Sequence, residues 1–338
     1  MTLEIFWFCA IAVLWGGYFA LEGFDFGVGM LLPFLARDER DRSKLLATIG
    51  PHWDGNEVWL VIAAGATFAA FPAWYATMFS GFYLVLVLIL VLLIVRVLSF
   101  EWRERADDRR WLGGWRWANT IASFGAPFLW GVALANLLHG VPLDGDGHFS
   151  GNVLDLFNAY TVAAGVAVTL LFALHGATFL ALRTEGGLRE RSRAAARRLA
   201  APAAVVVAAF LAWTVQVAVD RNDRELVPVL IPALIGGAAL ALGLATALRG
   251  RSGWAFTAST LSALALVATL FSALYPYVIV SDPDIGNSLT VSGAATAHYA
   301  LSVITVVAAV VLPVMMLYQG WTYHVFRTRV RPAQEPPG

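Results

Sequence analysis

Cysteine and charged residues are both scarce in this chain of 338 residues. The one cysteine, Cys9, excludes an internal disulfide and a metal site built from several thiolates. Aspartate, glutamate, lysine and arginine together make up 14% of the chain, against roughly 25% in a soluble domain. The formal net charge is zero, so the charge gives no support to nucleic acid as a partner. We therefore expect lipid around most of the chain, and no nucleic acid.

The sequence also lacks the short motifs of several enzyme classes. It contains no glycine-rich phosphate loop, serine nucleophile elbow, zinc motif or dinucleotide fingerprint. A cleaved signal peptide is not indicated either, because Glu4 stands where basic residues are expected. The first apolar run is therefore expected to remain in the chain as a transmembrane helix.

Long apolar runs are abundant, and hydrophobic residues make up 59% of the chain. A helix needs about 20 apolar residues to cross the hydrocarbon core of a bilayer. Nine runs of this kind occur, at 5–35, 53–76, 78–99, 117–139, 155–182, 200–219, 227–248, 254–276 and 297–325. The sequence therefore predicts an all-α integral membrane protein with nine transmembrane helices.

The basic residues indicate how these helices are oriented. Nearly all arginines of the predicted connections fall in one set, which includes the C-terminal tail, and the other set holds only Arg221 and Arg224. By the positive-inside rule, the arginine-rich set lies in the cytoplasm. We therefore expect the N-terminus outside and the C-terminus in the cytoplasm.

A short internal echo indicates how the helices are grouped. Residues 20–23 (ALEG) resemble residues 173–176 (ALHG). This favours two similarly oriented four-helix bundles plus one peripheral helix, although a match this short also arises by chance. The predicted units are a first half at 1–139, an outer loop at 140–154, a second half at 155–276, an outer loop at 277–296, a ninth helix at 297–326 and a disordered cytoplasmic tail at 327–338. The glycine, proline, aspartate and serine content of the two outer loops predicts turns rather than strands.

Two acidic residues lie deep in the first predicted helix. Glu22 and Asp25 share one helix face. The nearby Gly23, Gly27 and Gly29 allow a neighbouring helix to approach closely. A bare carboxylate is costly at that depth. We therefore expect a cationic partner or a carboxyl group that keeps its proton, either in a proton path or in a structural anchor between helices.

A second acidic pair, Asp54 and Glu57, stands at the cytoplasmic mouth of the second predicted helix. Aspartate followed three residues later by glutamate resembles a capping box, so Asp54 can be read as a local helix cap. Trp53, Trp59 and Asn56 surround the pair with aromatic and polar groups that a cap alone does not need. We favour a proton-uptake site that faces a partner helix or subunit.

Histidine is the residue type that most directly raises the question of haem. His175 in the fifth predicted helix and His298 near the outer start of the ninth are candidate ligands. The predicted helix directions put them toward opposite sides of the membrane, whereas two ligands of one haem need a matching depth. Structural histidine is therefore favoured, and we expect no haem or metal on this chain. Arg96, near the inner end of the third helix, is expected to snorkel or to pair with an inner carboxylate such as Glu101.

At several of these residues the chain resembles subunit II of the cytochrome bd family of quinol-oxidising terminal oxidases. The tryptophan-aspartate-glycine-asparagine tetrad at 53–56 is the most specific match. The matching stretches are EGFDFGVGMLLPFL (22–35), GPHWDGNEVWLVIAAGATFAAFP (50–72), FSGFY (79–83), GVALANLLHGVP (131–142), HGATFLALRT (175–184) and NSLT (287–290). They extend from the first predicted helix to the loop before the ninth.

The resemblance implies a complex rather than an isolated protein. Its subunit I would carry the haems b558, b595 and d and the main quinol site, while subunit II carries no haem. The complex would oxidise quinol and reduce oxygen to water in the bacterial cell membrane. A third, very small subunit is also implied and, in some members, a quinone bound to subunit II.

The resemblance also implies roles for individual residues. Asp54 is similar to the family aspartate that lines a proton path from the cytoplasm toward the haems. Trp59 resembles a tryptophan beside an oxygen-access tunnel. Glu57 departs from relatives that have glutamine here, and two carboxyl groups one turn apart titrate together, so either can carry the proton. Glu57, Glu22 and Asp25 are therefore further candidates for the proton path.

Two other functions also fit the sequence. A proton-coupled secondary transporter is favoured by the intramembrane acids and the internal echo, and it would work without subunit I. A passive scaffold would only stabilise subunit I. In that case, variants with amides in place of acids would lower neither the turnover rate nor proton uptake.

Overall fold

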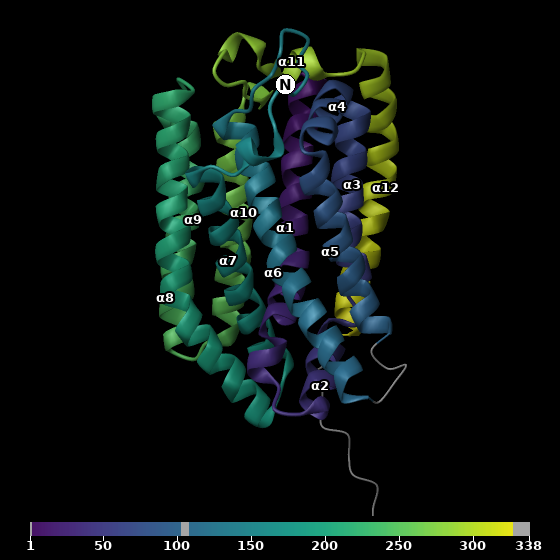
Figure 1. The fold of residues 1–338 in the computed structure, drawn as a ribbon, viewed down its shortest axis with the longest axis vertical. Helices are drawn as coiled ribbons and strands as arrows, with labels where there is room; N and C mark the ends of the chain where they lie inside the picture. Colours follow the sequence, from purple (N-terminus) through teal and green to yellow (C-terminus); the bar gives the residue numbers. More distant parts are fainter. Residues whose placement is uncertain (1, 103–107, 327–338) are drawn as a thin grey trace, which may run out of the picture.

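The chain folds into a bundle of long helices (Figure 1). The computed structural model describes residues 2–102 and 108–326, and the predicted tail at 327–338 lies outside them. The long helices are α1 (Leu3–Leu35), α3 (Trp53–Ala70), α5 (Tyr83–Glu101), α6 (Arg109–His139), α7 (Ala159–Arg183), α8 (Gly186–Gln216), α9 (Leu226–Leu248), α10 (Ser252–Leu274) and α12 (His298–Val325). The class is therefore all-α, as the sequence predicts.

Eight helices of the described part are long and apolar enough to cross a membrane. This number agrees with an integral membrane protein. The helix α3 is not among the eight, because its first turns hold Asp54, Asn56 and Glu57. The total of nine spans stays a prediction.

Helix α1 lies in the middle of the bundle and contacts α3, α6, α7 and α10. The helices α8 and α9 lie along one side of the molecule, and α3, α5 and α12 lie along the opposite side (Figure 1). The residues that α1 presents are therefore enclosed by helices from both predicted halves. The division into two four-helix bundles stays a prediction.

The two ends of the bundle differ in structure. One end, which we call the basic end, holds α2 (Glu39–Ile49) and the arginine-bearing start of α8. The other, the loop end, holds α4 (Pro72–Gly81), α11 (Val291–Ala294) and the two longest connections. Short turns within these connections are η2 (Val153–Leu156) and η4 (Ile285–Asn287), and a π-turn, η3 (Val217–Arg221), follows α8.

Helices α1 and α7 cross with their backbones in contact. A Cβ atom on Gly27 would lie 2.0 Å from the carbonyl oxygen of Phe172, and one on Gly176 would lie 2.4 Å from the carbonyl carbon of Gly27. Only a residue without a side chain fits such a crossing. The predicted close approach at the glycines of the first helix is therefore confirmed. The partner is α7 at Gly23 and Gly27, and α6 at Gly29.

The predicted run at 53–76 is divided at Phe71. Helix α3 ends at Ala70 and α4 begins at Pro72. Proline lacks the N–H that would continue the hydrogen bonds of α3, and it is favoured in the first position of a helix. The prediction of one helix that continues to residue 76 is therefore wrong.

The predicted outer loop at 277–296 contains strands as well as turns. Strand β1 (Tyr277–Ile279) pairs antiparallel with β2 (Leu289–Thr290), with Tyr277 opposite Thr290. The expectation of turns rather than strands is wrong here. Tyrosine, valine and isoleucine favour strands, but pairing depends on a segment ten residues away that composition alone does not identify.

Candidate functional site

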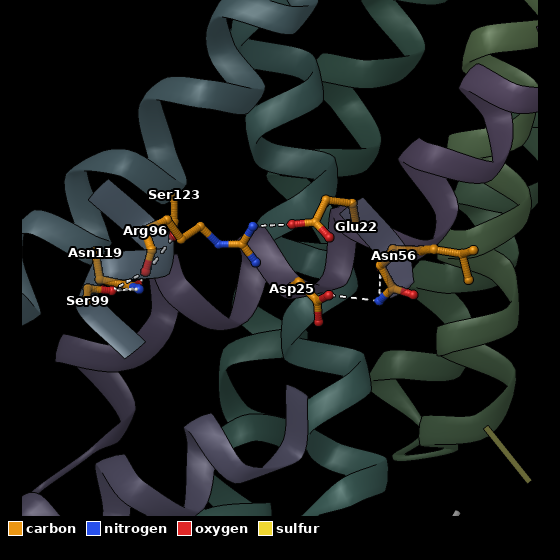
Figure 2. A network of polar contacts seen from close by, with 8 residues as sticks. Glu22, Asp25, Asn56, Arg96, Ser99, Asn119 and Ser123 are labelled. Atoms are coloured by element: carbon orange, nitrogen blue, oxygen red, sulfur yellow. Dashed lines mark hydrogen bonds and ion pairs between the residues drawn. The ribbon is translucent and has the colours of Figure 1, made fainter. Parts of the chain in front are cut away.

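Glu22 and Asp25 lie on α1, and both side chains are fully buried. The guanidinium of Arg96, on α5, forms an ion pair with Glu22 Oε1 (Figure 2). The predicted cationic partner for the buried acids is thus confirmed. The carboxylate that pairs with Arg96 is Glu22 and not Glu101, the example named from the sequence, because Arg96 points into the bundle while Glu101 is exposed.

Arg96 lies on the buried, mainly apolar face of α5. The buried positions of this helix recur every three or four residues and include Val85, Ile89, Leu93 and Arg96. The arginine therefore occupies the packed face of the helix. Its guanidinium carbon lies 4.5 Å from the centroid of the Phe26 ring. The aromatic face and the carboxylate together stabilise a charge that has no access to water.

A chain of polar side chains continues from Arg96 to α6. Ser99 donates a hydrogen bond to the Arg96 carbonyl, and the Asn119 amide donates to Ser99 Oγ at 2.6 Å. Ser123 donates to Asn119 Oδ1 at 3.4 Å (Figure 2). Gly29 makes room for this contact, because a Cβ there would lie 2.0 Å from Ser123 Oγ. These three residues were not predicted, since isolated serines and asparagines in apolar helices carry no spacing signal.

On the other side of the acids, Asn56 joins α3 to α1. Its Nδ2 donates to Asp25 Oδ2 at 2.8 Å and to the Leu21 carbonyl at 3.3 Å. Its Oδ1 accepts hydrogen bonds from Gln319 Nε2 at 3.1 Å and from the Tyr323 hydroxyl at 2.8 Å. Gln319 and Tyr323, both on α12, were not predicted. The two residues could have been identified from the sequence, because they are polar groups one turn apart in the last apolar run.

Asp54 and Glu57 lie near the start of α3, at the basic end. The residue that caps this helix is His52, without a side-chain hydrogen bond. The interpretation of Asp54 as a helix cap is therefore wrong. Asp54 is exposed and Glu57 is partly buried, so the two carboxyl groups stand at the surface of the chain rather than in its interior.

Asp54 lines two separate hollows on either side of α3. The first is a groove of about 370 Å³ between α3 and α5, which Glu57 also lines. The second is a pocket of about 200 Å³ between α3 and α12, and its polar lining includes His52, Gln319 and Tyr323. We call these the α3–α5 groove and the α3–α12 pocket. Asp54 is therefore accessible from both hollows.

Trp59 lies on another face of α3 from Glu57. A Cβ atom on Gly17 of α1 would lie 2.2 Å from the Trp59 ring, so the indole packs directly on the α1 backbone. Its Nε1 donates to Gln319 Oε1 at 2.6 Å. Among the predicted site residues, Glu22 and Asp25 thus meet inside the bundle, Asp54 and Glu57 share the groove, and Trp59 faces α1 and α12.

His52 is a buried residue in the lining of the α3–α12 pocket. Its ring is stacked on Tyr323, with the ring centroids 4.4 Å apart. Burial, with a smaller contribution from the charge of Arg183, lowers the pKa of His52 to about 4. The imidazole is therefore neutral near pH 7.

The two candidate haem ligands, His175 and His298, are respectively hydrogen-bonded inside the protein and exposed at its surface. His175 is buried, with Nδ1 2.7 Å from Ser259 Oγ and Nε2 3.0 Å from the Ala20 carbonyl. Both ring nitrogens are thus used by the protein, which favours a structural role. His298 lies at the exposed start of α12. Over residues 2–102 and 108–326, no cluster of three histidine, cysteine or acidic side chains is suited to a metal ion.

Comparison with known proteins gives one family over nearly the whole chain. The family model for cytochrome bd terminal oxidase subunit II matches residues 3–326. The chain is 39% identical to cytochrome bd ubiquinol oxidase subunit 2 of Bacillus subtilis over 97% of each chain. It is 36% identical to cytochrome bd-I ubiquinol oxidase subunit 2 of Escherichia coli, over 95% of this chain and 93% of the relative.

A solved structure supports the fold. A chain of the bd oxidase from Geobacillus thermodenitrificans superposes with a TM-score of 0.75, over 97% of this chain and 98% of that chain. The two are 19% identical, so this likeness concerns the fold alone. From the matched family model and the two relatives, the chain belongs to the cytochrome bd terminal oxidase subunit II family.

Proposed function

We propose that this chain is the haem-free subunit II of a bd-type terminal oxidase and supplies it with a proton path from the cytoplasm. Its relatives are subunits of cytochrome bd ubiquinol oxidase, a complex that oxidises quinol and reduces oxygen. The chain is accordingly a multi-pass protein of the bacterial plasma membrane and is not catalytic alone. The haems b558, b595 and d and the main quinol site belong to subunit I. We further propose that the complex contains a small third subunit and that a quinone binds to this chain.

The basic end is assigned to the cytoplasm. It gathers the arginine-rich connections, and such connections stay on the cytoplasmic side of bacterial membranes. The acidic pair Asp54 and Glu57 then opens toward the cytoplasm. Protons consumed in the reduction of oxygen would enter from this side.

The side formed by α3, α5 and α12 is assigned to subunit I. Helix α12 buries only Leu301 against the rest of the described chain. Asp54 and Glu57 open on the same side of the molecule. A carboxylate that faces lipid is costly, so a protein partner with polar groups is expected over the α3–α5 groove. In this proposal the two acids lie between the subunits.

One observation carries the proton path. At the basic end, two surface carboxyl groups lie on the helix that also contacts the buried acids of α1, through Asn56. Carboxyl groups at graded depths give protons successive binding positions between water and the interior. Asp54 and Glu57 form the entrance, and Glu22 and Asp25 form an inner group. Trp59 is assigned to the oxygen tunnel on the family resemblance.

The test is Asp54→Asn in the assembled oxidase. The amide keeps the size of the side chain but cannot take up and release a proton at neutral pH. We expect quinol-dependent oxygen consumption to fall at least several-fold while the haem content of the purified complex is retained. Glu190→Gln is the matched control, because Glu190 is an exposed acid of α8, outside both hollows.

Full turnover and normal proton uptake in Asp54→Asn would favour the passive scaffold. The Glu22–Arg96 ion pair, which joins α1 to α5, would then be read as a structural anchor. A secondary transporter would instead move its substrate in membranes that contain this chain without subunit I.

A further inference from the structure

Asn56 lies between the lining of the α3–α12 pocket and the buried Asp25. The pocket has a volume of about 200 Å³, enough for several water molecules at roughly 30 Å³ each. Asn56 is fully buried and contacts Asp25 on one side and two residues of the pocket lining, Gln319 and Tyr323, on the other. Its position therefore decides whether water in the pocket can reach Asp25.

Asn56 has no free hydrogen-bonding capacity in this position. An asparagine amide offers two N–H donors and a carbonyl with two acceptor positions. The donors are used by Asp25 and the Leu21 carbonyl, and the acceptor is used by Gln319 and Tyr323. An amide does not bind or release protons at neutral pH, so a fixed Asn56 blocks proton exchange between pocket and acid.

The groups that fix Asn56 belong to a loosely packed helix. Of the residues of α12, only Leu301 is buried. At the loop-end half of α12, Trp7 Nε1 donates to Thr305 Oγ1, and near the basic end Gln319 and Tyr323 hold Asn56. Apolar contacts of Ile304, Ala308 and Leu312 also hold α12 against the bundle, but these residues are only partly buried. A shift of the basic-end part of α12 would therefore release Asn56.

The interior behind Asn56 is suited to water. Buried polar atoms normally have a hydrogen-bond partner. Within residues 2–102 and 108–326, the protein supplies none for Glu22 Oε2, Asp25 Oδ1, Arg96 Nε and Nη2, or the Tyr18 hydroxyl. These atoms surround one ion-pair cluster, so water admitted past Asn56 would find several partners there.

We propose that Asn56 is a gate between the α3–α12 pocket and the Glu22–Asp25–Arg96 cluster, held closed by Gln319 and Tyr323 of α12. Release of these two contacts lets Asn56 swing away and connects the buried acids with water in the pocket. The role of this gate in turnover rests on the proposed proton path, because the gate would control the passage of protons along it. Because α12 lies on the side assigned to subunit I, the partner's contact with α12 would set how often the gate opens.

The test measures access to Asp25 directly, in the assembled oxidase. A water-soluble carbodiimide with glycine methyl ester converts a reachable carboxyl group into an amide and releases a urea. Peptide mass spectrometry then gives the extent of modification at each acid. In the wild-type complex we expect Glu190 to be modified and Asp25 to be protected. In Tyr323→Phe we expect modification of Asp25 to rise about two- to tenfold, the population change produced by loss of one neutral hydrogen bond. Gln319→Leu also removes the hydrogen bonds of Gln319 with Trp59 and the Gly55 carbonyl, so we expect at least the same rise in this variant.

Two further variants make the test specific. Thr305→Val removes the hydrogen bond between α12 and Trp7 and should leave Asp25 protected. Asn56→Ala removes the gate and should give the highest modification, in complexes whose haem content is normal. An equal rise in Thr305→Val would mean that α12 merely loosens, and unchanged protection of Asp25 in Tyr323→Phe and Gln319→Leu would overturn the proposal.

The two proposals fail separately. If Asp54→Asn retains full turnover while Asp25 becomes reachable in Tyr323→Phe, the gate stands and the proton path to the haems falls. If Asp54→Asn loses turnover and Asp25 stays protected in every variant, the path stands without the gate.

Discussion

Glu22 and Arg96 hold opposite charges at a depth where neither reaches water. Each charge is tolerated because the other is present, and the Phe26 ring covers the guanidinium. At the scale of single residues, each member of the ion pair therefore depends on the other for its stability in the interior. An acid-to-amide change at the surface and one in the interior should have different consequences.

Removal of one partner from the Glu22–Arg96 pair should destabilise the protein strongly. Arg96→Leu leaves Glu22 buried without a counter-charge, which costs about 3–5 kcal/mol. We expect a lower thermal midpoint and a lower yield of the assembled oxidase. The double variant Glu22→Gln with Arg96→Leu should recover much of the loss, because no lone charge remains. Equal losses in the single and double variants would show that the two charges do not depend on each other.

His52 should make stability depend on pH in the acidic range. Its pKa is lowered from 6.5 to about 4 in the folded chain. The unfolded chain therefore binds the proton more readily, and stability decreases as the pH falls from about 6.5 toward 4. We expect the thermal midpoint to fall less steeply over this range in His52→Phe, which keeps a ring against Tyr323. Identical pH profiles in variant and wild type would contradict this assignment.

At the scale of elements, the helices were predictable where one apolar run forms one helix. The runs behind α9 and α10 have the predicted extent to within a few residues, because helix formation depends on local periodicity. Pro72 is present in the sequence, but the helix break at this proline was not predicted. The β1–β2 pairing was not predictable from composition, because its partners meet only after the loop has folded.

The α1–α7 crossing gives a prediction for two glycines that look alike in sequence. In Gly176→Ala, the new Cβ would lie 2.4 Å from the backbone of Gly27, and the helices would have to separate, at a cost of about 1–3 kcal/mol. Gly237→Ala, in α9, places its Cβ where nothing lies within 4 Å and should leave stability unchanged or raised. The thermal midpoints of the two variant complexes test this difference. A neutral Gly176→Ala would mean that the helices are not in backbone contact.

At the scale of the whole molecule, the assigned subunit interface can be tested with two equally exposed valines. Val61 lines the α3–α5 groove and is 68% exposed, while Val205 on α8, on the opposite side of the bundle, is 67% exposed. Val61→Trp should obstruct a partner at the groove, and Val205→Trp should simply face lipid. We expect less haem-bearing subunit I to co-purify with Val61→Trp. The same yield from both variants, or a loss in Val205→Trp alone, would move the interface to another side.

The sequence alone determined the membrane class, the approximate extent of α1, α7, α9, α10 and α12, the asymmetry of basic residues and the presence of four acids near or within the spans. These properties depend on composition and on spacing within one helix, so no knowledge of neighbouring helices was needed. The family resemblance, later borne out by the matched family, also came from contiguous motifs.

Only the tertiary structure decided which residues meet. Arg96 pairs with Glu22 across 74 positions of the chain, and Tyr323 reaches Asn56 across 267. Such contacts depend on which helices pack side by side and on how each helix is rotated about its axis. The glycines permit close packing, but they do not determine which helix is the neighbour. The sequence supplied the charged and polar groups, and the packing of α1, α3, α5 and α12 arranged them into one connected site.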